Sequence, residues 1–276
     1  MFLVTGATGN VGGELVRTLA GTGAQVRALS RQNKPAALPS SVQIVTGDLN
    51  HPGTLAGALA GVDGVFLLSG YDDMPGLLSQ ARQAGVTRVV LLSGGGARST
   101  DTANAVSAYM LASEAAVQDS GLAWTILRPA AFMSNALRWA AQIRASDTVR
   151  EPFADVRVAV IDPADIAAVA AAALATGEHP GRTYSLSGPE SLLPADRLRI
   201  LAQVLRRDLH LEPQSDEDAH EQMSQEMPEE YVRAFFSFYV DGTLDESRVE
   251  PAVEQILGRP PRNFARWAHA HADAFR

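Results

Sequence analysis

Three glycines near the start of the chain have a spacing that suits phosphate binding. Gly6, Gly9 and Gly12 follow the apolar residues 1–4 and open the amphipathic residues 11–20. This order predicts a strand, a tight turn at Gly6, a close approach of backbone to a pyrophosphate at Gly9, and close helix packing at Gly12. The free N–H groups at the start of a helix, and the helix dipole, favour an anion there. The pattern predicts a dinucleotide-binding unit, and a strand–helix turn without a ligand is the alternative.

The residues after the second expected strand indicate which dinucleotide would bind. An NAD-binding unit carries a carboxylate here for the adenine ribose, whereas this chain has Arg31 and, shortly after it, Lys34, its only lysine. A guanidinium group pairs with phosphate oxygens at two points. We therefore expect NADP(H) rather than NAD(H), with Arg31 and Lys34 at the 2′-phosphate; the alternative is that both are ordinary solvated charges.

Apolar runs alternate with helical patterns in the first half of the chain. Such alternation predicts a doubly wound parallel sheet, a Rossmann-type α/β fold with helices on both faces. The strands read as continuous apolar runs, as buried parallel strands do. The expected strands are residues 2–4, 25–29, 43–45, 64–68, 88–92 and 124–127, and the expected helices are residues 11–20, 54–60, 74–84, 104–120 and 134–144.

The second half of the chain predicts a small α/β cap over the edge of the sheet where ligands bind. We expect an NADP(H)-binding core in residues 1–150 and a substrate-side portion, interwoven with it, in residues 151–276. Within the second portion, residues 213–227 are acidic and polar and predict a mobile loop. The expected strands there are 156–160 and 183–186, and the expected helices are 166–175, 194–205, 229–240 and 261–275.

Composition narrows the classes of function. The chain has 276 residues, a net charge of −8 and no cysteine, which excludes disulfides, a thiolate nucleophile and zinc–thiolate sites. The negative charge and the lack of a basic run argue against nucleic acid as a partner. No apolar run is long enough to span a bilayer, the histidines are not spaced to share a metal ion, and we expect a cytoplasmic protein.

Several motifs together resemble the NmrA-like group of atypical short-chain dehydrogenases/reductases, over nearly the whole chain. The resemblance implies an NADP(H)-binding protein, either a quinone reductase or a redox sensor without turnover. The motifs are Thr5-Gly6-Ala7-Thr8-Gly9-Asn10-Val11-Gly12, Gly47-Asp48-Leu49, Leu92-Ser93, Leu127-Arg128-Pro129, Asp162-Pro163-Ala164-Asp165-Ile166-Ala167 and Gly258-Arg259-Pro260-Pro261.

The expected cofactor contacts follow the ends of the strands. Asp48 has a second interpretation, as a brace of its own loop, and Asp162 and Asp165 are read as a helix cap and a first-turn acid rather than as catalytic carboxylates. The expected contacts are Thr5, Gly6, Thr8, Gly9, Asn10, Val11, Gly12, Arg31, Lys34, Asp48, Leu49, Ser69, Gly70, Ser93, Gly94, Arg128, Pro129, Ala130, Ala131 and Phe132.

Tyr109 is the candidate catalytic residue, as a proton donor. Short-chain dehydrogenases generally place a lysine one helical turn after such a tyrosine, where it lowers the tyrosine pKa, but the corresponding residue here is Ser113. Without a nearby cation we expect the pKa of Tyr109 to stay near its ordinary value of about 10. A packing role for Tyr109 is the alternative.

Hydride transfer to a quinone or a conjugated carbonyl needs less apparatus, because such an acceptor is itself electrophilic. Phe132, Asn135, Phe235 and Phe238 are the residues expected to line an apolar substrate pocket; plain core packing is the alternative for the aromatic helix that holds the last two. The sequence thus predicts an NADPH-dependent reductase of a small apolar electrophile, with a possible homo-oligomer or protein partner. The alternative function is an NADP(H)-responsive regulator that binds a partner protein and has no turnover.

Overall fold

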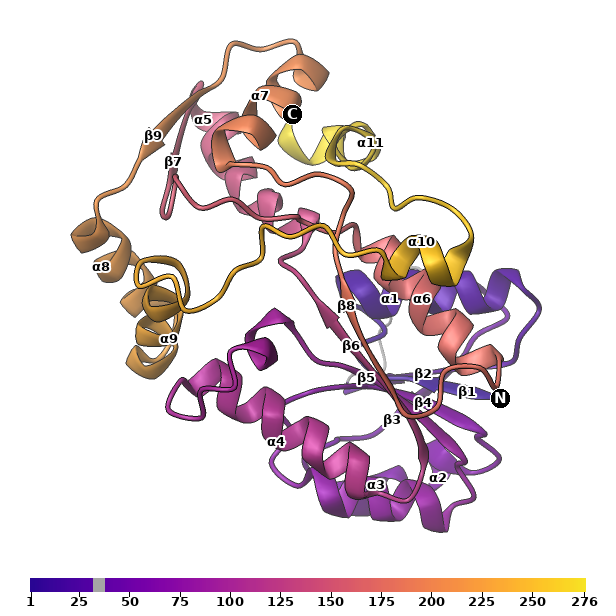
Figure 1. The fold of residues 1–276 in the computed structure, drawn as a ribbon. Coiled ribbons are helices and arrows are strands. Elements are labelled where there is room, and N and C mark those ends of the chain that lie inside the picture. Colours follow the sequence, from indigo (N-terminus) through magenta and orange to yellow (C-terminus); the bar gives the residue numbers. More distant parts are fainter. Residues whose placement is uncertain (32–37) are drawn as a thin grey trace.

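A seven-stranded parallel sheet forms the centre of the computed structural model, which describes residues 1–31 and 38–276 (Figure 1). The strand order is β3-β2-β1-β4-β5-β6-β8. The chain leaves β1 toward one side of the sheet and returns to its other side at β4, and ligands bind at such a reversal in folds of this type. The strands are β1 (Phe2–Val4), β2 (Val26–Ser30), β3 (Gln43–Thr46), β4 (Gly64–Leu68), β5 (Arg88–Leu92), β6 (Ala123–Pro129) and β8 (Arg182–Leu186).

Helices cover both faces of this sheet. One face packs against α1 (Asn10–Gly21) and α6 (Pro163–Ala175), with α10 (Ala252–Leu257) on α6. The other face packs against α2 (Ala56–Leu59), α3 (Met74–Gln83) and α4 (Ala105–Asp119). The doubly wound parallel fold expected from the sequence is confirmed. Both β8 and α6 lie after residue 150, yet they complete this sheet and its first helical face.

The remaining elements form a second part beyond the carboxyl ends of the strands (Figure 1). Its core contains Trp139, Phe264, Trp267 and Phe275. A short two-stranded parallel ladder joins β7 (Thr148–Glu151) to β9 (His210–Pro213). The helices here are α5 (Ala140–Ala145), α7 (Pro194–Leu205), α8 (Asp216–Glu226), α9 (Glu229–Tyr239) and α11 (Phe264–Ala270).

Four expectations about elements in this part are wrong. Residues 213–227 contain α8 instead of a loop, because the Ser215 side chain caps the helix and three acids in its first turn suit the helix dipole. Residues 156–160 make only an isolated bridge between Val158 and Leu192. The segment expected as one helix, residues 134–144, starts as the 3₁₀ turn Met133–Trp139 before α5. The closing helix expected over residues 261–275 is shorter, since α11 ends at Ala270. No helix in the described part of the chain is long and apolar enough to cross a membrane.

Candidate functional site

The glycine turn has the geometry that its spacing predicts. Gly6 has a φ of +60°, which favours glycine, and its carbonyl oxygen accepts a hydrogen bond from the N–H of Gly9 at 2.9 Å. A Cβ on Gly12 would lie 2.2 Å from that same carbonyl oxygen. Helix α1 can therefore approach β1 this closely only with glycine at position 12.

A cavity of about 440 Å³ lies beside the N-terminus of α1. Gly9 caps this helix without a side-chain hydrogen bond, and no acidic residue occupies its first turn, so its first N–H groups remain available. Thr8, Gly9 and Asn10 form one wall. From the opposite side the cavity is lined by Arg262, Arg266 and His271. Two carboxylates also line it, and both have partners within the protein: Asp162 caps α6, and Glu14 pairs with Arg17. The donors and charges present fit a pyrophosphate.

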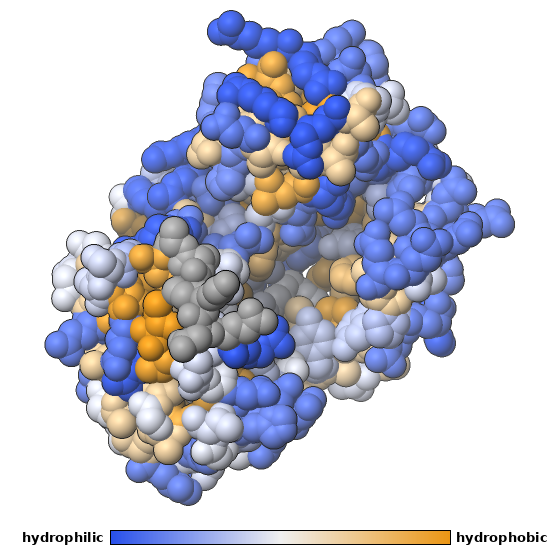
Figure 2. Space-filling model, turned by 180° about the vertical axis from the view of Figure 1, so that it is seen from behind, coloured by the Kyte–Doolittle hydropathy of each residue, from blue (hydrophilic) through white to orange (hydrophobic). Residues whose placement is uncertain are grey.

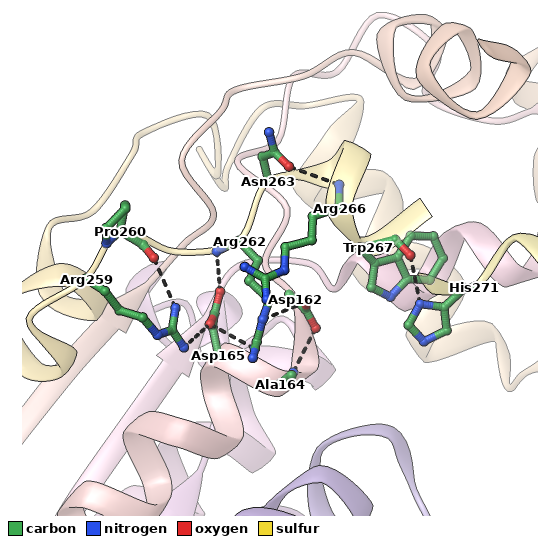
Figure 3. A network of polar contacts seen from close by, with 10 residues as sticks. All are labelled: Asp162, Ala164, Asp165, Arg259, Pro260, Arg262, Asn263, Arg266, Trp267 and His271. Atoms are coloured by element: carbon green, nitrogen blue, oxygen red, sulfur yellow. Dashed lines mark hydrogen bonds and ion pairs between the residues drawn. The ribbon is translucent and has the colours of Figure 1, made fainter. Parts of the chain in front are cut away.

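The wall opposite α1 is held in place by a buried carboxylate at the start of α6 (Figure 3). Asp165 is fully buried and accepts hydrogen bonds from Arg259 Nη2 at 2.7 Å and from the backbone N–H and Nη1 of Arg262. Asp162 caps the same helix by accepting from the N–H of Ala164 at 2.9 Å. The capping and first-turn roles expected for the two aspartates are confirmed, and Asp165 also ties the segment before α11 to α6.

The side chains at the end of β2 and β3 meet at the surface. Arg31 is exposed. Hydrogen bonds from His51 and Asn50, with a smaller contribution from the charge of Arg31, lower the pKa of Asp48. Asp48 accepts from the N–H of Asn50 at 3.0 Å and pairs with Nδ1 of His51 at 2.9 Å. Asp48 thus braces its own loop, and Arg31 points to solvent where a 2′-phosphate could reach it; Lys34 lies outside the described residues.

Ser93 and Arg128 both direct their side chains at one buried acid, Glu114 of α4. Arg128 binds it with Nε at 2.8 Å and with Nη2, and the Ser93 hydroxyl donates to Oε1 at 2.6 Å. Their side chains are therefore committed within the protein, and the backbone N–H of Ser93 also donates within it, to the Leu127 carbonyl at 2.8 Å. Glu114 was not among the expected site residues, because it carries no motif of its own.

Tyr109 lies beside the end of β4 with no basic neighbour one turn later. A Cβ on Gly70 would lie 3.3 Å from its ring, and the ring of Tyr231 packs edge-on at 6.4 Å. Ser113 instead accepts a hydrogen bond from the N–H of Gly70 at 3.0 Å. Burial, with a contribution from Tyr231, raises the pKa of Tyr109, so the expectation of an unshifted value is wrong. The shift makes Tyr109 a weaker acid.

Other side chains of the protein occupy the space beside the glycine-rich residues 94–96. A Cβ on Gly94 would meet Met110 at 2.6 Å, and one on Gly96 would meet Phe238 at 3.2 Å. Gly95 faces a carboxylate oxygen of Glu246, whose other oxygen accepts from the Tyr239 hydroxyl at 3.2 Å. Packing therefore accounts for the missing side chains here.

Several other expected cofactor contacts have their side chains in the core. Thr5, Val11 and Leu49 are buried. The backbone N–H of Ala130 donates to the Leu186 carbonyl at 2.8 Å, and that of Ser69 donates to the Leu92 carbonyl at 3.1 Å. The backbone donors of Ala130 and Ser69 are therefore paired within the protein.

A second cavity, of about 450 Å³, lies between the 3₁₀ turn and α9. Asn135 and Phe235 line it as expected, together with Ala131. Phe238 does not, because it is 2% exposed in a cluster with Val106 and Leu244. Phe132 packs instead against the core under α1 and α6. Figure 2 shows a hollow between the part that contains the sheet and the second part, which lies beyond the carboxyl ends of the strands.

Two residues that line this second cavity were missed at the level of sequence. Tyr239 is half-buried and is bonded to Glu246, and Arg197 is buried on α7. Neither belongs to a recognisable motif, and both are brought to the cavity by elements that follow residue 190. Within the described residues no group of three His, Cys, Asp or Glu side chains is placed to hold a metal ion.

Comparison with known proteins shows that this chain is similar to proteins that bind NAD(P)H. A family profile described as NAD(P)H-binding matches residues 6–177. The (4-alkanoyl-5-oxo-2,5-dihydrofuran-3-yl)methyl phosphate reductase of Streptomyces griseus is 38% identical over 280 residues, covering 100% of this chain and 99% of that protein. The NAD(P)H azoreductase of Xenophilus azovorans is 35% identical over 284 residues, with coverage of 100% and 99%.

Solved structures share the fold at low sequence identity. The NADPH-dependent quinone oxidoreductase of Escherichia coli superposes with a TM-score of 0.81 at 21% identity, covering 100% of both chains. The Citrobacter sp. triphenylmethane reductase complexed with NADP(H) gives a TM-score of 0.80 at 22% identity, covering 99% of this chain and 100% of that one.

Proposed function

The chain belongs to the NAD(P)H-binding family that its residues 6–177 match, and we propose that it is an NADPH-dependent reductase of a small conjugated carbonyl compound. The two full-length relatives reported above are reductases. The substrate lies in the cavity lined by Asn135 and Phe235. The nicotinamide end of the cofactor lies between this cavity and the glycine turn, along residues 129–132.

The observation that carries this proposal is the position of one short segment between the two cavities. Ser134 and Leu137 line the cavity at the N-terminus of α1, whereas Ala131 and Asn135 line the second cavity. Asn10 Nδ2, at the start of α1, donates to Ser134 Oγ at 3.1 Å. A cofactor held at the glycine turn would therefore end next to the second cavity.

The chemistry asked of the protein is modest. Bound NADPH supplies a hydride. The chain's own residues hold the acceptor against an apolar wall that includes Phe153, Val156 and Phe235 and exclude bulk water, and orientation of this kind accounts for much of catalysis. The acceptor takes hydride at one end of its conjugated system and a proton from solvent at the other, so Tyr109 is not needed as an acid.

The names of the two relatives support a conjugated acceptor. The Streptomyces griseus protein is named for a furanone that carries an alkanoyl group, and the Xenophilus azovorans protein for azo compounds. Both kinds of compound have a polarised double bond that accepts hydride. A quinone belongs to the same chemical class and is the second acceptor that we expect.

We assign the preference for NADPH over NADH to Arg31. Its guanidinium is exposed just after β2. Its charge acts on the carboxylate of Asp48, but Asp48 is already bonded to His51 and Asn50. A 2′-phosphate could pair with Arg31 at two points. Neither relative reported above supports the alternative of a regulator without turnover.

The proposed function is tested by NADPH consumption with three acceptors: an acyl-substituted furanone, a simple quinone and an azo dye. We expect turnover with the furanone and the quinone, and a slower or absent reaction with NADH. NADPH binding measured beside it by calorimetry separates the outcomes. Tight NADPH binding without turnover on any acceptor would contradict the proposal and favour a regulator.

A further inference from the structure

Arg197 is a buried arginine that lines the second cavity and forms no ion pair with any of the described residues. It is 6% exposed, and its Nε atom is buried without a hydrogen-bond partner in the described part of the chain. Its guanidinium carbon lies 5.4 Å from the centre of the Trp139 ring. The stacked ring fixes the orientation of the guanidinium and leaves its donors unpaired.

The nearest carboxylate is already occupied. Glu151 is buried and binds the guanidinium of Arg138 with both oxygens, and it also accepts from Trp139 Nε1 at 2.8 Å. Two guanidinium groups therefore share one buried carboxylate. Burial lowers the pKa of Arg197 to about 10, so the side chain still carries its charge at neutral pH.

A buried charge is costly unless it is paired and hydrogen-bonded. Stacking on Trp139 and the charge of Glu151 offset part of this cost. The Tyr239 hydroxyl faces Glu246 instead of Arg197, and Arg150 at the cavity rim is paired with Asp218 at 3.0 Å. Arg197 therefore forms no ion pair within the described residues, although the carboxylates of Glu151 and Glu226 also line the cavity.

Part of the cavity wall is apolar. Phe153, Val156, Met223, Met227 and Phe235 line this part. Polar side chains, Gln142, Gln214 and Glu226 among them, line the rest. A volume of about 450 Å³ is within the range of small-molecule sites. The cavity therefore combines an apolar region with a buried cation.

We propose that Arg197 binds an anionic group, a carboxylate or a phosphate, carried by the substrate, whose apolar conjugated part lies against the wall around Phe235. This rests on the proposed function for the identity of the ligand as a substrate, although the anion site itself does not depend on turnover. A guanidinium fork suits either anion because it donates two parallel hydrogen bonds to two oxygens. Such a substrate would be a conjugated acid or phosphate ester, and a neutral acceptor such as a simple quinone would react without this contact.

The test compares three matched ligands by titration calorimetry without NADPH: azobenzene carboxylate, its neutral methyl ester, and the phosphate monoester of hydroxyazobenzene. We expect at least one anion to bind about tenfold or more tightly than the ester, as charge-assisted pairing implies. The tighter of the two anions identifies the preferred group. Equal affinity for the ester and both anions overturns the proposal.

Variants assign the preference to Arg197. Arg197→Gln should remove the preference for the anion, and Arg197→Lys should retain part of it. The matched control Arg199→Gln, at an exposed arginine on α7 that does not line the cavity, should keep it in full. If Arg197→Gln does not fold, the wild-type comparison and Arg197→Lys still decide. A preference that persists in folded Arg197→Gln places the anion elsewhere and overturns the assignment.

The binding test contains no NADPH, so its outcome is independent of turnover. Anion binding without NADPH turnover would refute the proposed function alone. Turnover without anion preference would refute the anion site alone.

Discussion

Asp165 and Arg259, which are 94 positions apart in the sequence, form a partly buried ion pair at 2.7 Å between the first turn of α6 and the segment before α11. Asp165 also accepts two bonds from Arg262. Since α6 packs on α1, this carboxylate positions the basic wall of α11 opposite the glycine turn. The cavity beside the glycine turn therefore depends on a residue that does not line it.

We expect Asp165→Asn to lower the free energy of unfolding by about 2–3 kcal/mol. This is the lower end of the cost of breaking a buried pair, because Arg259 and Arg262 reach solvent and are partly screened there. Asp273→Asn, which breaks the exposed pair with Arg276, should change stability by less than about 0.5 kcal/mol. Urea unfolding measures both, and equal effects would show that burial of Asp165 is not the cause.

Two adjacent glycines provide a test of the glycine turn. Gly12→Ala places a methyl group 2.2 Å from the Gly6 carbonyl oxygen, so α1 must move away from the turn, and NADPH binding should be lost together with about 1–3 kcal/mol of stability. Gly13→Ala meets only ordinary contacts, the nearest at 3.5 Å, and should be neutral or stabilising by up to about 1 kcal/mol. Intact NADPH binding in Gly12→Ala would refute the close packing of helix on turn.

The cofactor preference is tested at Arg31. Arg31→Asp should weaken NADPH binding roughly tenfold to a hundredfold, since a charge-assisted pair is lost and a repulsion is added, while NADH binding should change little. Arg82→Asp, at an exposed arginine in the last turn of α3, should leave both affinities unchanged. Calorimetric titration with each dinucleotide measures the ratio, and an equal loss for both cofactors would exclude the phosphate assignment.

Tyr109→Phe should change kcat by no more than about threefold. Loss of a general acid costs a factor of about 100 to 10,000, and a tyrosine whose pKa is raised by burial is poorly suited to that role. Steady-state rates with a quinone and with a furanone provide the measurement. A fall of about a hundredfold with either acceptor would restore Tyr109 as the proton donor.

The fold was predictable from the sequence where a local pattern carried the information. The apolar runs located the strands of the sheet, and the positions of Gly6 and Gly12 matched the backbone geometry of the turn. The cap of α6 by Asp162 was equally local. These features depend on residues that lie within one turn or one strand of each other.

The features that escaped sequence analysis depend on long-range contacts. Glu114 gains its role only because β5 and β6 bring Ser93 and Arg128 beside it. Phe235 and Phe238 are three residues apart on one helix, yet the first lines a cavity and the second is buried against Val106. The pattern of a single helix cannot distinguish these two environments.

Stability should fall as pH rises because of Glu246. Burial, the largest cause, raises its pKa, so the folded protein keeps this proton to a higher pH than the unfolded chain, whose glutamate pKa is about 4.3. Between these two pKa values the free energy of unfolding therefore declines with pH, and above the folded value the loss is complete. Asp162, whose pKa burial also raises, acts in the same direction and is common to every variant compared.

Glu246→Gln should remove part of this decline, because glutamine does not titrate. Urea unfolding between about pH 4 and pH 8 gives the difference between variant and wild type. Glu254→Gln, on the surface of α10, is the matched control and should reproduce the wild-type curve. Parallel curves for wild type and Glu246→Gln would mean that Glu246 does not titrate in this range.

The central claim, direct reduction of a conjugated carbonyl by NADPH, is tested most directly by following the hydrogen itself. The protein is mixed with NADPH deuterated at the transferable position of the nicotinamide and with an acyl-substituted furanone, and the product is analysed by mass spectrometry. The account predicts one deuterium on a carbon of the reduced conjugated system. Product without deuterium, or no product although NADPH binds tightly, would contradict it.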